Sequence, residues 1–258
     1  MRMIISPAKK MRTDSDTLEV LGMPRFLAQA EQLAGLLRTM SYLELKALWR
    51  CNDAIAALNV RRLETLDLRR GLTPALLAYD GIQYQHIAPA VFTREEYAYL
   101  QSHLCILSGL YGILRPFDGV TPYRLEMQAR LSGPGFSSLY QFWGDRLARA
   151  LAEETDLVLN LASREYSQAV LPHLPPSVRV ITCVFGEERE GRVAEKGTLC
   201  KMARGELVRW AAVSRLENPE ELSRFQALGF AFSPGRSSPE RFVFLRRPGG
   251  RQPSAKEL

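Results

Sequence analysis

The sequence predicts a mixed α/β fold: a single compact domain with a mostly parallel central sheet, antiparallel additions, flanking helices and a helical amino-terminal segment. In the second half of the chain, short apolar runs of strand length alternate with segments of helical periodicity. This alternation is typical of a parallel sheet covered by helices. The first half has one short apolar run and then mainly helical periodicity. A length of 258 residues is sufficient for one domain with a sizeable core.

One strand and several helices are predicted in the first half. An apolar run at residues 3–6 predicts a buried strand that leads into the segment Ser6-Pro7-Ala8-Lys9. Apolar residues then recur at spacings of three and four, which predicts a helix with one buried face. Capping-box patterns of Ser or Thr with Glu three residues later start two further helices. The predicted helices of this half cover residues 26–37, 41–49, 52–58 and 93–103.

Strands and helices alternate in the second half. Apolar runs predict strands at residues 104–107, 157–161, 178–185 and 242–245, with a turn at 187–191 leading into residues 192–194. Ser138 predicts the cap of a helix that runs to about Glu153, and Ser163 predicts the cap of a short one. Residues 199–216 have helical periodicity, and Asn218 followed by proline predicts another helical start. We place the domain at residues 1–247 and predict a disordered tail over 248–258.

Composition excludes several classes of protein. Of the formal net charge of +6, half comes from the segment 246–258, so the charge does not itself predict a nucleic-acid-binding surface. The four cysteines and three histidines are scattered without the spacing of a metal site, so we expect no metal and no cofactor. No apolar run approaches the roughly 18 residues of a membrane span, and the amino terminus lacks a signal-peptide pattern. We therefore expect a monomeric cytoplasmic protein without a membrane partner.

The segment from Ser108 to Met127 is the densest in chemically active residues. It holds three glycines and two prolines, which fix unusual backbone paths. The polar residues between them are Ser108, Tyr111, Arg115, Asp118, Tyr123, Arg124 and Glu126. This set favours a ligand site over a structural turn with solvated charges, because loops at the ends of buried strands often carry function.

Three predicted strands end in polar residues, and the carboxyl ends of parallel strands meet at one edge of a sheet. We therefore expect Lys9, Tyr111, Asn160 and Ser163 to share one cleft, although Ser163 also fits a role as a helix cap alone. Lys201 and Arg204 lie three residues apart on one helix face and would join this cleft. The complete candidate site is Ser6, Lys9, Ser108, Tyr111, Arg115, Asp118, Tyr123, Arg124, Glu126, Asn160, Ser163, Glu165, Tyr166, Lys201 and Arg204.

Cations and carboxylates are mixed in this candidate site. Five of its members are Lys or Arg, and Asp118, Glu126 and Glu165 balance them in part. Such a mixture suits a phosphate-bearing or nucleotide-like ligand. The alternative is a buried ion-pair network that only stabilises the fold.

Six segments carry a resemblance to a known family: ISPAK (5–9), SGLYGILRP (108–116), PYRLEM (122–127), LYQFWGD (139–145), NLASREY (160–166) and KMARG (201–205). In this order and spacing the chain resembles the YaaA family, which takes its name from a bacterial peroxide stress protein. The resemblance implies a cytosolic protein that limits oxidative damage, partly by lowering free intracellular iron. It also implies a single mixed α/β domain with a positively charged cleft and an affinity for duplex DNA.

The resemblance places a helix-hairpin-helix-like DNA contact at residues 41–66. Arg50, Arg61 and Arg62 are its candidate phosphate ligands, alongside Lys201 and Arg204 in the cleft. Ala57 stands where some relatives have glycine, and Asp80 stands where relatives can carry lysine. Since the first change would hinder close approach to a phosphate and the second removes a cation, we expect weak, non-specific DNA binding.

Two functions remain open from the sequence. The first is a peroxide-stress protein that binds DNA without sequence specificity. The second is an enzyme acting on a nucleotide-like or phosphorylated small molecule, in which Glu126 or Glu165 is a general base and Lys9 or Lys201 a phosphate clamp. No nucleophile motif, P-loop or dinucleotide fingerprint identifies a reaction or a catalytic residue. Without the spacing of a metal site, an effect on iron would be indirect.

Overall fold

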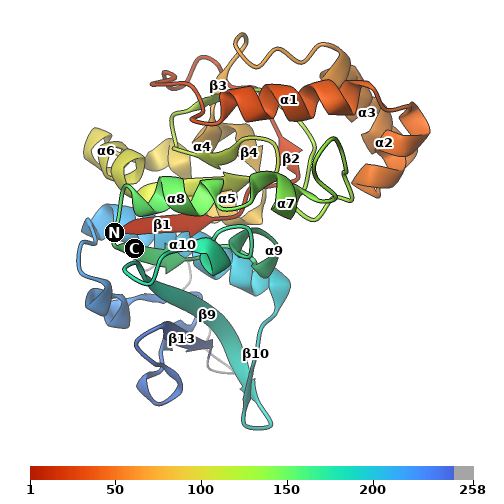
Figure 1. Cartoon of the computed structure of the whole chain (residues 1–258). Coiled ribbons are helices and arrows are strands. Elements are labelled where there is room, and N and C mark those ends of the chain that lie inside the picture. The colour runs from red at the N-terminus through yellow and green to blue at the C-terminus, as the bar shows by residue number, and fades with distance from the viewer. Residues whose placement is uncertain (247–258) are drawn as a thin grey trace.

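A nine-stranded sheet forms the centre of the computed structural model, which describes residues 1–246 (Figure 1). The strands of this sheet are β1 (Arg2–Ile5), β5 (Leu104–Ser108), β6 (Gly112–Leu114), β8 (Leu157–Asn160), β9 (Arg179–Arg189), β10 (Arg192–Ala194), β11 (Gln226–Ala227), β12 (Phe230–Phe232) and β13 (Arg241–Arg246). Their order is β11-β12-β13-β9-β8-β1-β5-β6, and β10 pairs with β9. The predicted tail at 248–258 lies outside the described residues.

Parallel pairing dominates the middle of the sheet. Strands β13, β9, β8, β1 and β5 are parallel neighbours, whereas β6, β10, β11 and β12 add antiparallel pairs. Strands β1, β5 and β8 are buried over almost their whole length, as expected for strands covered on both faces. The mixed α/β fold class predicted from the sequence is confirmed.

The helices are α1 (Leu27–Arg38), α2 (Tyr42–Trp49), α3 (Asp53–Glu64), α4 (Ala75–Ala78), α5 (Ile82–Ile87), α6 (Arg94–His103), α7 (Leu139–Trp143), α8 (Arg146–Ala152), α9 (Arg164–Ser167) and α10 (Gly197–Ser214). Short 3₁₀ turns follow at Pro89–Val91, Leu171–His173, Pro219–Arg224 and Pro234–Arg236. Figure 1 shows α1 to α3 at one end of the molecule and the β9–β10 hairpin projecting at the other. Helix α8 is drawn directly above β1 in this view.

Several predicted boundaries differ from the structure. The helix predicted from Ser138 to about Glu153 is broken into α7 and α8, because Gly144 adopts a left-handed φ of 51° between them. Strand β9 continues to Arg189, so the turn narrows to Glu190 and Gly191. The predicted helix at 52–58 extends to Glu64 as α3.

The sequence pattern missed several short elements. Strands β11 and β12 extend the sheet, while α4 and α5 lie between the amino-terminal helices and α6. Each is at most six residues long, too short for its periodicity to be recognised. Four further short strands lie outside the main sheet, where β2 (Lys10–Met11) pairs with β4 (Tyr79–Asp80) and β3 (Thr73–Pro74) with β7 (Gly119–Val120).

Helix α10 packs on α5, α6 and β9. None of the helices within residues 1–246 combines the length and the apolar character that crossing a bilayer requires.

Candidate functional site

A pocket of about 500 Å³ opens beyond the carboxyl ends of β1 and β8. Four parts of the chain form it: the segment after β1, the β4–α5 connection, the start of α9 and the first turns of α10. Its lining residues are Ser6, Pro7, Ala8, Lys9, Lys10, Asp80, Gly81, Ile82, Gln83, Tyr84, Ser163, Glu165, Tyr166, Lys201 and Arg204. Seven of the sequence-predicted site residues therefore lie around one cavity: Ser6, Lys9, Ser163, Glu165, Tyr166, Lys201 and Arg204.

Two serines join the segments that follow β1 and β8. The Ser6 hydroxyl donates to Ser163 Oγ at 3.1 Å and accepts from the Ser163 backbone N–H at 2.8 Å. The Ser163 side chain makes no capping bond to α9, so the interpretation of Ser163 as a helix cap alone is wrong. Asn160 is buried behind this joint, where its Oδ1 accepts from the Ala162 N–H at 3.0 Å. Asn160 thus shapes the loop and does not line the pocket.

Three lysines lie at the mouth of the pocket. Lys9, Lys10 and Lys201 are exposed, so their ammonium groups can contact an incoming anion. Lys10 Nζ lies 2.5 Å from Asp80 Oδ2, and this bond lowers the pKa of Asp80. Asp80 therefore offsets one of these cations.

Arg204 reaches the pocket from α10. Its side chain is only 14% exposed, and its Nη2 lies 3.7 Å from Glu195 Oε2. Its Nε is buried without a hydrogen-bond partner among the described residues.

A second, smaller recess lies on the other side of Lys9. Lys9 Nζ lies 3.3 Å from Glu126 Oε1, and Arg124 Nη2 lies 2.9 Å from the same oxygen. The Arg124 and Glu126 side chains are almost buried, and both line this recess together with Tyr123 and Tyr166. Lys9 is thus the cation that connects this ion pair to the main pocket.

Glu165 is the carboxylate most suited to proton exchange inside the main pocket. Burial raises its pKa, and the nearby Glu126 adds to this effect. Its Oε1 also accepts from the Gln128 N–H at 3.3 Å, which holds the side chain in place. A carboxyl group with a raised pKa is suited to general acid or base work near neutral pH.

A buried chain of hydroxyl groups lies behind the recess. Tyr123 OH shares hydrogen bonds with Ser108 Oγ at 2.6 Å and with Tyr79 OH at 2.9 Å. Ser108 Oγ also accepts from the Tyr111 N–H at 2.9 Å, and Tyr111 OH lies 3.2 Å from Thr121 Oγ1. Burial raises the pKa of Tyr123 and of Tyr111, which keeps both neutral. Ser108 and Tyr111 are therefore behind the pocket and not in its lining.

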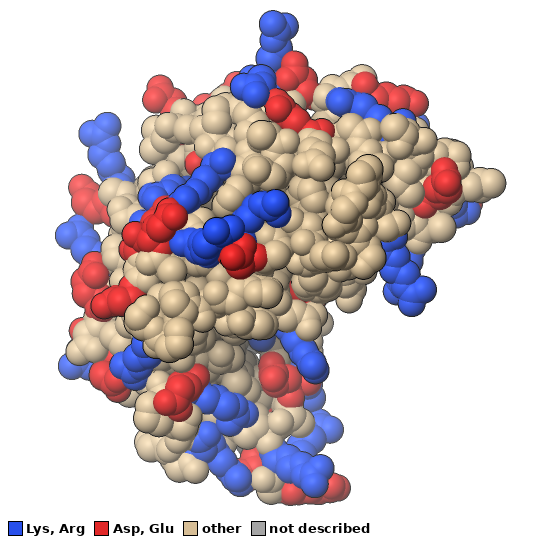
Figure 2. Space-filling view, in the orientation of Figure 1, with Lys and Arg blue, Asp and Glu red and all other residues tan. Residues whose placement is uncertain are grey.

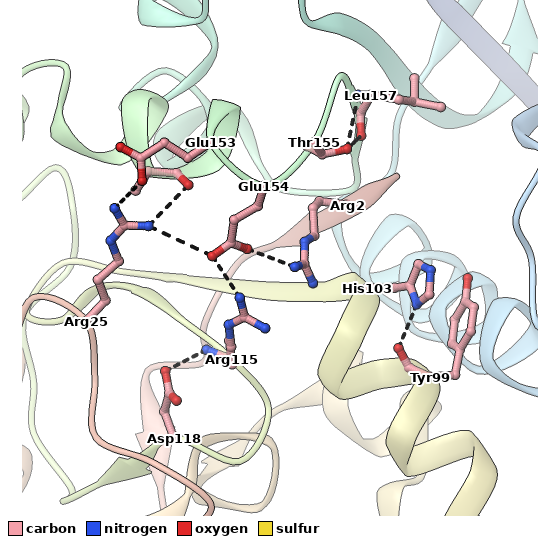
Figure 3. A network of polar contacts seen from close by, with 11 residues as sticks. Arg2, Arg25, Tyr99, His103, Arg115, Asp118, Glu153, Glu154, Thr155 and Leu157 are labelled. Atoms are coloured by element: carbon pink, nitrogen blue, oxygen red, sulfur yellow. Dashed lines mark hydrogen bonds and ion pairs between the residues drawn. The ribbon is translucent and has the colours of Figure 1, made fainter.

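Arg115 and Asp118 lie at the opposite edge of the sheet, so the prediction that they converge with Lys9 is wrong. Strand β6 pairs antiparallel with β5, which carries the chain back to the amino ends of the parallel strands. There Arg115 Nη2 lies 2.8 Å from Glu154 Oε1, and Arg2 Nη2 lies 3.0 Å from Glu154 Oε2 (Figure 3). Asp118 Oδ2 accepts from the Arg115 backbone N–H at 2.8 Å.

The β4–α5 connection contributes lining residues that the sequence did not indicate. Lys10 of β2 pairs with Asp80 of β4, which brings Gly81, Gln83 and Tyr84 against the segment after β1. The Tyr84 hydroxyl donates to the Ser6 carbonyl at 3.0 Å. No strand-end signal marks these residues, because β4 lies outside the main sheet.

The helix pair α2–α3 is the element for which the family resemblance implies a helix-hairpin-helix-like DNA contact. Its connection is Arg50–Asn52, and Arg50 takes the left-handed conformation with φ 45°. Ala57 lies inside α3, so the argument that alanine there hinders the hairpin's approach to phosphate is wrong. Arg62 donates to the Met11 carbonyl at 3.1 Å, and burial lowers its pKa. Arg61 is exposed, and like Arg50 it has no ion pair within residues 1–246.

The described part of the chain contains no cluster of side chains suited to bind a metal ion. Within residues 1–246, no group of three or more His, Cys, Asp or Glu side chains is arranged to hold an ion. The four cysteines are free thiols, three of them buried.

The fold and the pocket define a mixed α/β protein with a ligand-sized cavity whose mouth is lined by lysines. The chain belongs to the family described as peroxide stress protein YaaA, whose sequence profile matches residues 1–236. A UPF0246 protein of Lachnoclostridium phytofermentans is 48% identical over 246 residues, which cover 95% of this chain and 96% of the relative. UPF0246 proteins of Pediococcus pentosaceus and Desulfitobacterium hafniense are 46% and 48% identical, each over 95% of this chain and 98% of their own length.

Proposed function

We propose that this chain acts in the cytoplasm as a peroxide-stress protein, and that it does so by binding a small phosphate-bearing molecule in the main pocket. The family to which it belongs supports the stress role. The pocket supports the ligand class, because cations at its mouth suit a phosphate group. We propose a lowering of free intracellular iron as an indirect consequence of this activity.

The size of the pocket carries the proposal. A cavity of about 500 Å³ falls within the roughly 300–1,000 Å³ of small-molecule sites. Duplex DNA instead needs an exposed basic track. On the face drawn in Figure 2, Lys and Arg side chains are interspersed with Asp and Glu and form no continuous track.

The arrangement of charges suggests a division of roles. Lys9 follows β1 and Lys201 belongs to α10, and both are exposed residues of the pocket lining, so both are accessible to a phosphate. Glu165 also lines the pocket, and burial raises its pKa. We propose Lys9 and Lys201 as phosphate ligands and Glu165 as the group that exchanges a proton with the bound molecule.

Isothermal titration of the full chain with ribose 5-phosphate and with inorganic phosphate tests this function. We expect ribose 5-phosphate to bind and to raise the melting temperature of the parent protein. Lys201→Glu should weaken binding at least about tenfold, because it replaces a charge-assisted contact by repulsion. Arg209→Glu makes a similar charge change on the same helix outside the pocket lining and should bind like the parent. If neither phosphate compound binds the parent, the proposed function is wrong.

Duplex DNA is a second candidate ligand. The supporting observation is the α2–α3 connection, where Arg50 and Arg61 are exposed and unpaired within the described part of the chain. These cations can contact phosphates without reading bases. We propose any DNA contact for this helix pair, separate from the pocket.

A further inference from the structure

The amide of Gln83 is a buried donor without an acceptor. Gln83 is the second residue of α5, is only 7% exposed, and lines the main pocket. Its Nε2 has no hydrogen-bond partner among residues 1–246. Buried polar side chains are rarely left unpaired, because an unsatisfied donor costs stability. An unpaired amide at a cavity wall therefore points to a partner that occupies the cavity.

Two glycines hold α5 in a position that keeps Gln83 inside. A Cβ at Gly205 of α10 would lie 2.3 Å from the Gln83 carbonyl oxygen, so only glycine allows this approach. A Cβ at Gly81 would lie 2.8 Å from Ala8 Cβ, on the other side of the pocket wall. Helix α5 is thus enclosed between α10 and the segment after β1. This packing fixes the Gln83 backbone before any ligand binds, as a recognition residue requires.

Arg204, which lines the same pocket, carries a second unpaired donor. Its Nε is buried without a partner in the part of the chain that the structure describes. An arginine side chain can only donate hydrogen bonds, so the missing partner must be an acceptor. The two unpaired donors, Gln83 Nε2 and Arg204 Nε, together favour a ligand whose buried part carries hydrogen-bond acceptors such as carbonyl oxygens or ring nitrogens.

The pocket also changes in polarity from mouth to interior. Lys9, Lys10 and Lys201 are exposed, whereas Tyr84, Tyr166 and Gln83, which also line the pocket, are buried. A nucleoside phosphate has the same distribution, with charge at one end and a flat apolar ring with polar edges at the other. Aromatic walls and a few placed polar groups are the usual surroundings of such a ring.

We propose that Gln83 is a ligand-recognition residue, and that the pocket takes a nucleoside monophosphate whose base carries a carbonyl group. In the complex, Gln83 Nε2 and Arg204 Nε donate to the base and the lysines hold the phosphate. This inference rests on the proposed function, since it assumes that the pocket binds a phosphate compound.

Isothermal titration of the full chain with three compounds tests the inference. Inosine 5′-monophosphate carries the base carbonyl, purine riboside 5′-monophosphate lacks it, and ribose 5-phosphate lacks the base. We expect the first to bind the parent at least about tenfold more tightly than the other two. Gln83→Met, which keeps the length but removes the amide, should bring the first two compounds to similar affinity. Gln85→Met, the same change at an exposed site on α5, should leave the preference intact.

The unliganded variants provide an independent readout. Because Gln83→Met removes an unpaired buried donor, its melting temperature without ligand should equal or exceed that of the parent. A clear loss of stability relative to Gln85→Met would show that Gln83 is structural and would overturn the inference.

The two proposals fail in different ways. Should ribose 5-phosphate bind the parent as tightly as inosine 5′-monophosphate, the assignment of Gln83 is wrong while the phosphate-binding function stands. Equal affinities for the two nucleotides would likewise exclude carbonyl recognition. Absence of binding by all three compounds would remove both proposals.

Discussion

Burial raises the pKa of Asp118 to about 6, so this single carboxyl group changes its charge close to neutral pH. The side chain lies at the edge of the sheet opposite the pocket, where it accepts the Arg115 backbone N–H (Figure 3). Burial outweighs the stabilising effects of that bond and of the Arg115 charge. The charged form is therefore tolerated in the fold at a cost.

The pH dependence of stability follows from this shift. The folded-state pKa of Asp118 lies above the ordinary value of 3.8. The protonated Asp118 side chain therefore contributes to the free energy of unfolding below about pH 4, and this contribution is lost as the pH rises through 6. Asp118→Asn keeps an acceptor for Arg115 but does not ionise. Relative to this variant, we expect the parent to lose on the order of 2 kcal/mol of unfolding free energy between pH 4 and pH 7.5. Urea denaturation of both proteins across this range measures the difference, and a constant difference would contradict the assignment.

Which site residues could be predicted depends on how each is connected to the sheet. Ser6, Lys9 and Ser163 follow parallel strands directly, so the rule that parallel strands end at one edge was enough to bring them together. Arg115 could not be placed by this rule, because three residues of antiparallel pairing reverse the chain before it. Gln83 gave no signal, since its burial depends on a contact with α10 that is distant in sequence.

At the scale of elements, the packing of α10 on α5 connects the fold to the pocket. Gly205 of α10 allows close packing of the two helices, because it lies against the backbone carbonyl of Gln83 in α5. Helical periodicity in residues 199–216 was sufficient to predict α10. It could not predict α5, because six residues give less than two turns of pattern.

Gly205→Ala should disrupt this contact. The added Cβ meets the Gln83 carbonyl oxygen at 2.3 Å, and backbone cannot move aside as a flexible side chain can. We expect a loss of about 2 kcal/mol in unfolding free energy, within the range of overpacked cores. Gly197→Ala is a matched control in the same helix, because no atom lies within 4 Å of its Cβ position. Urea denaturation of both variants decides the point, and equal stabilities would show that the helices separate without cost.

At the scale of the whole molecule, the exposed cations proposed to contact ligands belong to two groups. Lys9, Lys10 and Lys201 surround the pocket mouth, while Arg50 and Arg61 are exposed on the α2–α3 pair. The sequence predicted one shared cleft for all of the candidate cations, apart from those of the hairpin. It could not show that the cleft is a cavity of limited volume, because this depends on the side chains that close its walls.

The separation of the two regions predicts that DNA binding and ligand binding respond to different substitutions. The double variant Arg50→Glu/Arg61→Glu should weaken binding to a short duplex and reduce the slope of log K against log salt by about 2, since each lost phosphate contact removes about 0.9. The same variant should bind ribose 5-phosphate like the parent. Lys201→Glu should show the opposite pattern, with normal DNA affinity and weakened ligand binding.

Fluorescence anisotropy with a labelled duplex at several salt concentrations measures the DNA affinity of each variant. Isothermal titration measures its affinity for ribose 5-phosphate. Arg209→Glu controls for net charge in both. If Lys201→Glu weakens DNA binding as much as the double variant does, DNA enters the pocket region and the assignment to α2–α3 is wrong. DNA affinity that does not change with salt in the parent would exclude phosphate contacts altogether, because releasing condensed counterions makes such binding salt-dependent.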